Sequence, residues 1–257
     1  MAQRNLWTKE ELILAFNLYL KIPFAKISSR NKDVIHLANI IGRTPNSIAL
    51  RLVNFASVDP VLKARGIKGM DGGTKIVQPI WDEFFNNQEE LVFSSEQFLA
   101  EKEKTTIEKK YKDILQDLND LKGETVIREV KTRVNQSVFR QMVLGNYSTQ
   151  CAITGIDIPE LLFASHIVPW SQNEKERLNP ENGICLSPLY DKAFDRGLIG
   201  INSNYEIILS KELKMKSTSA FFANHFAMIE DKKIAEPLNY FPRKDFLEYH
   251  HNNIFKK

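Results

Sequence analysis

The hydrophobic pattern changes character near residue 147, and this change constrains the fold more than any other feature of the chain. Before it, apolar residues recur at the three- and four-residue spacings of amphipathic helices. After it, segments 149–155, 160–168 and 182–186 ("TQCAITG", "ELLFASHIV" and "NGICL") predict short strands. Segment 187–197 ("SPLYDKAFDRG") predicts one compact helix. Helices that come first, followed by short strands, predict an α+β protein.

At 257 residues, the chain is long enough for one large domain or two modest ones. We expect a helical domain over residues 1–92, a helical linker over 93–125 and a mixed domain over 126–257. The linker is predicted as one long charged helix over 95–122. Its apolar positions alternate spacings of four and three, as in a coiled-coil seam. These positions are Ile107, Tyr111, Ile114, Leu118 and Leu121. Packing against the chain's own domain and dimerisation both explain this seam.

The first domain has the plan of a helix-turn-helix. Thr8, with Glu11 three residues later, predicts a capped helix over 7–20. Gly42 separates a second helix from a third, which begins at the Thr44–Pro45 pair. In a DNA-reading protein the exposed face of that third helix enters the major groove. The predicted DNA-contacting residues around this face are Arg43, Asn46, Ser47, Arg51 and Asn54. The alternative is an ordinary helical bundle.

Three polar residues lie at or near the ends of predicted strands, or in the predicted helix, of the second domain. His166 ends one predicted strand, Asn182 begins the next, and Asp191 lies nine residues further on, in the compact helix. A histidine after an apolar strand is often structural. A turn asparagine and a helix carboxylate are common in themselves, so only the combination is specific.

This order and spacing resemble those of HNH endonucleases, in which a hairpin and one helix form a ββα-metal finger around a single divalent cation. The matching segments are "ASHIVPW", "NGICLSPLYD" and "DKAFDRG", and the lead-in "RVNQSVFRQMVLGNYSTQCAITG" is similar to that of restriction-type members. The resemblance covers about residues 127–210. It implies a C-terminal HNH nuclease domain.

The resemblance also implies a role for each residue. Hydrolysis of a phosphodiester needs an activated water and a cation. His166 would take the proton of the water, Asn182 would hold the His166 loop or ring, and Asp191 would bind Mg²⁺ or Mn²⁺. Asp195 lies one helical turn later, as a second ligand or as an ordinary helix carboxylate. Ser165 stands where many relatives have an aspartate ligand, and its hydroxyl is a weaker ligand.

Composition narrows the remaining possibilities. Two cysteines are too few for a four-cysteine zinc site, so we expect no structural zinc. No apolar run reaches membrane-spanning length, and the first residues lack the order of a signal peptide, so we expect a cytoplasmic protein. The net charge of +3 permits a polyanionic partner.

We therefore expect a metal-dependent endonuclease of restriction type that acts on double-stranded DNA. A homodimer is expected because one HNH centre cuts one strand, and two-fold symmetry supplies a second centre. Two alternatives stand beside this function. One is a nicking or weakly specific nuclease, and the other is a non-catalytic DNA-binding protein that keeps only the fold.

Overall fold

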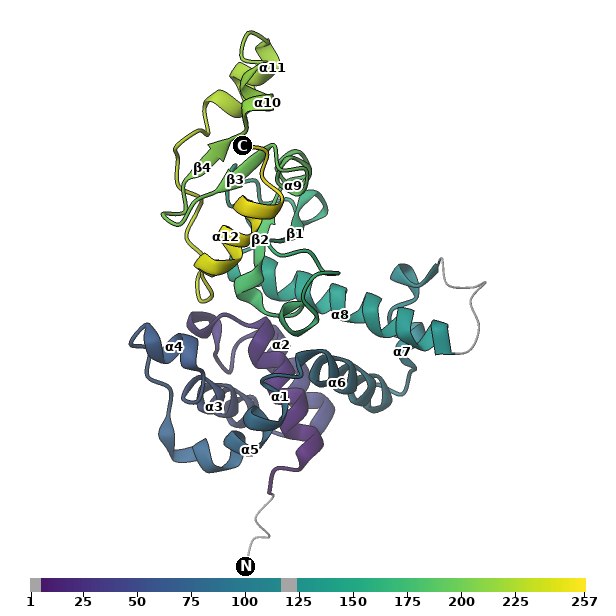
Figure 1. Cartoon of the computed structure of the whole chain (residues 1–257). Helices are drawn as coiled ribbons and strands as arrows, with labels where there is room; N and C mark the ends of the chain where they lie inside the picture. The colour runs from purple at the N-terminus through teal and green to yellow at the C-terminus, as the bar shows by residue number, and fades with distance from the viewer. Residues whose placement is uncertain (1–5, 117–123) are drawn as a thin grey trace, which may run out of the picture. The chain divides into compact units, whose positions relative to one another are not determined.

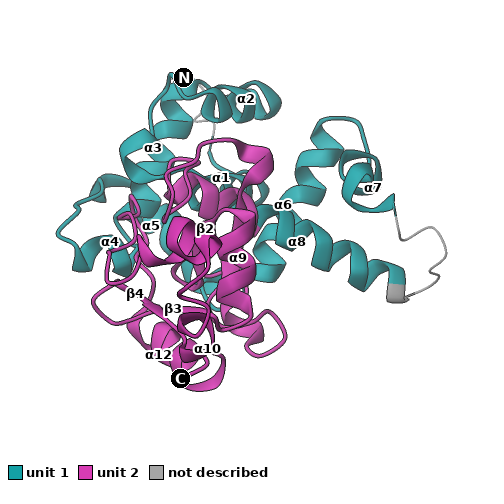
Figure 2. Cartoon of the chain, turned by 90° about the horizontal axis from the view of Figure 1, so that it is seen from above, with its two compact units in different colours: residues 1–138 teal, residues 139–257 magenta. Residues whose placement is uncertain are grey.

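The computed structural model describes residues 6–116 and 124–257, which are mainly helical (Figure 1). The chain divides into two compact units, residues 1–138 and 139–257 (Figure 2). This division falls inside helix α8, Glu124–Asn146. The border expected from the sequence, at residue 125, lies near the start of the same helix. Among the described residues, no helix is both long and apolar enough to cross a membrane.

Unit 1 contains the predicted series of amphipathic helices. Its α-helices are α1 (Lys9–Lys21), α2 (Lys32–Ile41), α3 (Pro45–Ala56), α4 (Pro60–Ala64), α5 (Thr74–Phe84), α6 (Gln88–Lys102) and α7 (Ile107–Lys110), with the first part of α8. Short 3₁₀ turns lie at Phe24–Lys26, Asp71–Gly73 and Lys112–Ile114.

Local signals set the ends of the first three helices. Thr8 and Glu11 form the predicted capping box of α1. Gly42 adopts the left-handed conformation (φ 69°) that ends α2. Thr44 caps α3 by accepting the backbone N–H of Ser47. The order helix, glycine turn, capped helix is therefore present as predicted.

Aromatic side chains form the centre of unit 1. The ring centroid of Phe16 lies 4.7 Å from that of Phe55 and 5.0 Å from that of Trp81, so α1, α3 and α5 share one stack. Tyr19 joins the stack and donates its hydroxyl to Asp59 at 2.6 Å. Burial of these large rings contributes to the stability of the unit.

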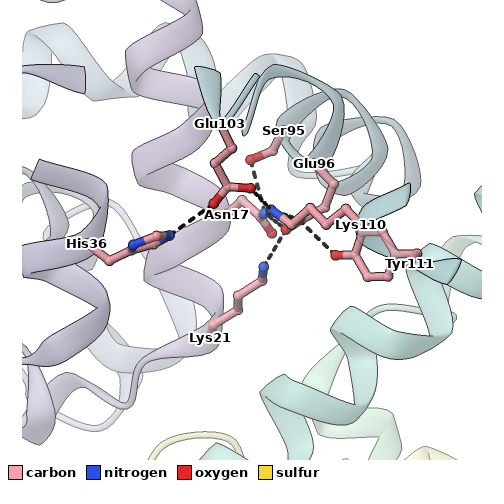
Figure 3. Close-up of polar contacts among 8 residues, drawn as sticks. All are labelled: Asn17, Lys21, His36, Ser95, Glu96, Glu103, Lys110 and Tyr111. Atoms are coloured by element: carbon pink, nitrogen blue, oxygen red, sulfur yellow. Dashed lines mark hydrogen bonds and ion pairs between the residues drawn. The ribbon is translucent and has the colours of Figure 1, made fainter. Parts of the chain in front are cut away.

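Glu96 on α6 is a charged side chain that is almost completely enclosed (Figure 3). Its carboxylate accepts hydrogen bonds from Lys21 at 2.5 Å, Asn17 at 2.9 Å and Tyr111 at 2.8 Å, and Lys110 lies 3.4 Å away. Burial acts to raise the pKa of Glu96, but the charges of Lys21 and Lys110 outweigh it and hold the pKa at about 2. The network joins α1, α6 and the α7 segment.

The prediction of one continuous helix over 95–122 is wrong. Helix α6 ends at Lys102, the backbone of Lys104 is left-handed (φ 56°), and Thr106 caps the separate helix α7. Ile107 packs with Phe93, Leu115, Val130 and Val134 in the core of unit 1, with Tyr111 against them. Of the other seam positions, Ile114 is 38% exposed and lies outside this core. Leu118 and Leu121 lie outside the described residues. Ile107 and Tyr111 therefore pack within their own unit.

Unit 2 contains all the strands of the described chain. They are β1 (Phe163–His166), β2 (Gly183–Leu186), β3 (Ile199–Ile201) and β4 (Ile207–Leu209). The helices of unit 2 are α9 (Pro188–Asp195), α10 (Lys211–Lys214), α11 (Ala220–Phe222), the π-helical turn Ala223–Ala227 and α12 (Lys244–Asn253), besides the second part of α8. Short 3₁₀ turns lie at Pro159–Leu161, Glu174–Glu176 and Pro180–Asn182.

The two sheets are antiparallel pairs, β1 with β2 and β3 with β4. Strands are present within 160–168 and 182–186 and the helix within 187–197, as predicted, and a hairpin around Asn202 follows them. The strand predicted over 149–155 is absent, because Thr149 and Gly155 take left-handed φ angles and the segment forms a turn. The observed β1, β2 and α9 thus have the ββα order.

Candidate active site

Strands β1 and β2 bring His166 and Asn182 to the same end of a hairpin. His166 pairs with Gly183, the residue after Asn182. Glycine fits at position 183 because an added Cβ would lie 2.3 Å from Val143 Cγ2 and 2.9 Å from Phe139 Cζ. The close approach of α8 to β2 therefore explains the glycine that follows Asn182.

The imidazole of His166 is held on several sides. Its ring stacks on Phe139 of α8, with centroids 3.9 Å apart, and meets the edge of Trp170 at 5.5 Å. Nε2 lies 2.9 Å from the carbonyl oxygen of Arg177. A carbonyl only accepts, so Nε2 carries the proton and Nδ1 carries the lone pair. Burial lowers the pKa of His166 to about 4, so the ring is neutral at pH 7.

Asn182 is 1% exposed and binds only backbone. Its Oδ1 accepts the N–H of Val168 at 2.8 Å, and its Nδ2 donates to the carbonyls of Val168 at 3.1 Å and Glu176 at 3.2 Å. Its own carbonyl accepts the N–H of Ile167. These bonds fix the chain on both sides of the loop after His166, so Asn182 is a positioning residue.

Helix α9 supplies two carboxylates one turn apart. The hydroxyl of Ser165, from β1, donates to Asp191. Burial and the neighbouring charge of Asp191 raise the pKa of Asp195. Two carboxylates that repel each other in this way are stabilised when a cation lies between or beside them.

One cavity of about 360 Å³ collects these groups. It is lined by Phe163, Ala164, Ser165, His166, Pro169, Trp170, Asp191, Asp195, His250 and Ile254. The predicted base and the predicted metal-binding residues therefore line one cavity. Asn182 is not part of the lining but holds the loop after His166 through Val168. With a cation bound at the acidic pair, this cavity would suit attack on an anionic group beside the imidazole.

The donor atoms fit a hard divalent cation. Mg²⁺ and Mn²⁺ prefer oxygen ligands, and Mg²⁺ is commonly held by one or two carboxylates with water and substrate phosphate. Asp191 and Asp195 provide two carboxylates, and Ser165 a hydroxyl. Within residues 6–116 and 124–257, no three His, Cys, Asp or Glu side chains cluster as a metal site. A cation here would therefore depend on water and substrate for its remaining ligands.

The predicted DNA-contacting residues lie in unit 1, and the structure corrects the view that all five surround an exposed face. Arg51 is 8% and Asn54 2% exposed. Arg51 donates to Asn54 at 3.1 Å, and Asn54 donates to the carbonyl of Met70 at 2.8 Å. Both side chains are buried because the chain after α4 covers this part of α3.

Arg43 is also engaged within the chain. Its guanidinium donates to both carboxylate oxygens of Glu11 at 2.8 and 2.7 Å and lies 4.3 Å from the ring centroid of Trp7. Asn46 is exposed and Ser47 half-buried at the start of α3. Of the five predicted residues, these two remain available at the surface.

Three residues of the site were not predicted from the sequence. Phe139 and Arg177 hold His166, and His250 lines the cavity from α12. Phe139 lies in the lead-in segment, so helical periodicity predicts its burial but not its partner. His250 follows Asp191 by a long stretch of sequence, and no local pattern connects the two.

Comparison with known proteins agrees with this geometry. Residues 151–202 match the family model of an HNH endonuclease. The matched segment contains His166, Asn182, Asp191 and Asp195, and it supports an HNH nuclease domain in unit 2. No curated protein matches the chain.

Proposed function

We propose that this chain is a metal-dependent endonuclease of restriction type that hydrolyses phosphodiester bonds of double-stranded DNA. One observation carries the proposal. The neutral imidazole of His166, with Nε2 committed to the Arg177 carbonyl, shares a cavity with the carboxylates of Asp191 and Asp195. The match of residues 151–202 to HNH endonucleases supports the same assignment.

His166 acts as the general base in this mechanism. Its Nδ1 takes a proton from the attacking water while Nε2 keeps its hydrogen bond to the Arg177 carbonyl, which spreads the resulting positive charge. Phe139 keeps the ring plane fixed during this transfer. Asn182 holds the loop that carries Val168, and so fixes the end of β1 from which His166 projects.

Asp191 and Asp195, with Ser165, would hold the divalent ion. Its chemistry there would be to neutralise charge on the scissile phosphate and on the departing oxygen. Ser165 orients the Asp191 carboxylate through its hydroxyl. Trp170 and Ile254 contribute apolar surface to the lining of the cavity.

Unit 1 would grip the duplex. Asn46 and Ser47 at the start of α3 are available to reach base edges or phosphates, since side chains at the N-terminal end of a recognition helix make such contacts. We also propose a homodimer on DNA, because two centres cut both strands of a palindromic site. Sedimentation with a cleavable duplex tests the dimer, and a monomeric complex that makes concerted double-strand breaks would contradict it.

Supercoiled plasmid incubated with Mg²⁺ or Mn²⁺ tests the main proposal. Linear product supports it, persistent nicked circles identify a nicking nuclease, and gel retardation without cleavage identifies a non-catalytic DNA-binding protein. His166→Ala should retain DNA binding and lose cleavage by about 10²–10⁴-fold. The control is His36→Ala, which removes an exposed histidine of unit 1 and should cut like the unmodified protein. Equal cutting by the two variants would refute the role of His166.

A further inference from the structure

A second histidine of the cavity lies outside the segment that matches the nuclease family. His250, on α12, is 2% exposed and stacks on Phe194 of α9, with centroids 3.8 Å apart and ring planes 5° from parallel. Its Nε2 lies 3.0 Å from the carbonyl oxygen of Phe194. Because a carbonyl only accepts, Nε2 donates and the ring is anchored at the C-terminal end of α9.

His166 and His250 are held in the same way. Each stacks on a phenylalanine, each donates from Nε2 to a backbone carbonyl, and burial lowers the pKa of each to about 4. The difference is the element that each one fixes. His166 belongs to β1 itself, whereas His250 reaches across from α12 to the helix that carries both acidic residues.

The contact of His250 with α9 is reinforced by the chain that follows it. The backbone N–H of Lys256 donates to the carbonyl of Gly197 at 3.0 Å. An added Cβ at Gly197 would lie 2.0 Å from the carbonyl oxygen of Ile254, so the two backbones touch. His250, Ile254 and Lys256 therefore hold the end of α9, through the ring and carbonyl of Phe194 and through Gly197.

Phe194 lies directly beside Asp195 and three residues after Asp191 on a helix of only eight residues. A short helix is defined by few internal hydrogen bonds, so contacts at its end decide its rotation and position. A shift of α9 would move both carboxylates relative to β1. Metal sites are sensitive to such outer contacts, whose loss commonly costs 10–100-fold in affinity.

We propose that His250 is a positioning residue of the nuclease centre, which fixes the end of α9 so that Asp191 and Asp195 face the cavity. The proposal rests on the proposed metal-dependent function for its catalytic meaning. It extends the functional unit to His250, Ile254 and Lys256, well beyond the matched segment 151–202. His250 acts through α9 and takes no part in proton transfer.

Two variants separate the two contacts of the ring. His250→Phe keeps an aromatic ring on Phe194 but removes the donor, and His250→Gln keeps an amide donor for the Phe194 carbonyl. His251→Ala is the matched control, since it removes the adjacent histidine, which faces a different cavity. Circular dichroism and thermal unfolding establish that each variant is folded before any comparison.

Two measurements then test whether His250 fixes the position of α9. Mn²⁺ binding to the protein without DNA, by calorimetry, should weaken about 10-fold or more in His250→Phe, and much less in His250→Gln and His251→Ala. Hydrogen exchange of the α9 amides should be faster in His250→Phe, with β1 and β2 unchanged. Cleavage by His250→Phe should recover at high Mn²⁺, unlike cleavage by His166→Ala.

Unchanged Mn²⁺ affinity and unchanged α9 exchange in folded His250→Phe would overturn the proposal. Failure of the proposed function gives a different result, because the unmodified protein would then neither cut plasmid nor bind Mn²⁺. In that case α9 exchange alone decides whether His250 fixes the helix, and unchanged exchange refutes the role of His250 as well.

Discussion

Asn182→Ala tests whether the loop after His166 depends on a single buried amide. The change removes three hydrogen bonds and leaves the N–H and C=O of Val168 without their partner, whereas the C=O of Glu176 keeps the N–H of Asn179. Each buried polar group left unpaired costs about 1–3 kcal/mol. Water entering the vacated space recovers part of this, so we expect a loss of about 2–4 kcal/mol in the free energy of unfolding of unit 2. The free energy of unfolding of a typical domain is about 5–15 kcal/mol, so this loss would be a large fraction of it.

The cysteines provide a probe that reports on unit 2 alone. Cys151 and Cys185 are both buried in unit 2, and the chain contains no others. Labelling of these thiols during a urea titration therefore measures the opening of unit 2 without a signal from unit 1. In Asn182→Ala, the urea concentration at which the thiols become labelled should be much lower. Without urea, the folded variant should cut plasmid more slowly than the unmodified protein.

Asn253→Ala is the control for this experiment. Asn253 is exposed on α12 and makes one hydrogen bond, to the carbonyl of Tyr249 at 2.8 Å. Its loss should change the free energy of unfolding by no more than about 0.5 kcal/mol, as for most surface substitutions. If Asn182→Ala is destabilised by less than about 1 kcal/mol, the loop is held by other contacts and the reasoning fails.

Three further predictions concern charge. Asp191→Ala should lose Mn²⁺-dependent cleavage by at least about 10-fold more than Asp195→Ala, because Asp191 is also oriented by a neighbouring hydroxyl; Mn²⁺ titrations of both variants check this, and the opposite ranking would reassign the principal ligand. Burial keeps His166 neutral down to its pKa of about 4, so single-turnover cleavage should persist below pH 6.5 and fall as the pH drops through about 4; a fall centred at 6.5 would mean an ordinary, solvated histidine. The pKa of Glu96 is lowered from 4.5 to about 2, so its contribution of up to about 3 kcal/mol is complete above pH 4.5 and is lost as the pH falls towards 2. Acid unfolding of Glu96→Gln should lack this pH-dependent part, and identical acid profiles would contradict it.

The ββα order was predictable because its signals are local. Pro188 at the first position of α9 and Gly197 after its end (φ 68°) bound that helix by rules that need only neighbouring residues. Strand β1 ends at His166, shortly before Pro169, for the same kind of reason. The fold of this segment could therefore be anticipated, together with the residues that share its cavity.

Contacts between distant segments could not be anticipated. Arg51 and Asn54 have the polarity of an exposed helix face, but the carbonyl of Met70 and the ring of Trp7 lie against them. Polarity alone does not distinguish a side chain bonded to solvent from one bonded to backbone. The same limit applies to His250, whose partner in α9 lies 56 residues earlier.

That separation also sets the order in which the cavity is completed during synthesis. A nascent chain that has emerged only as far as residue 202 contains the whole matched segment, but not the two cavity residues from α12 and its end, His250 and Ile254. Translation at about 5–20 residues per second supplies them several seconds later. During this interval the nascent chain contains His166, Asp191 and Asp195, but the cavity lacks the part of its lining that His250 and Ile254 supply.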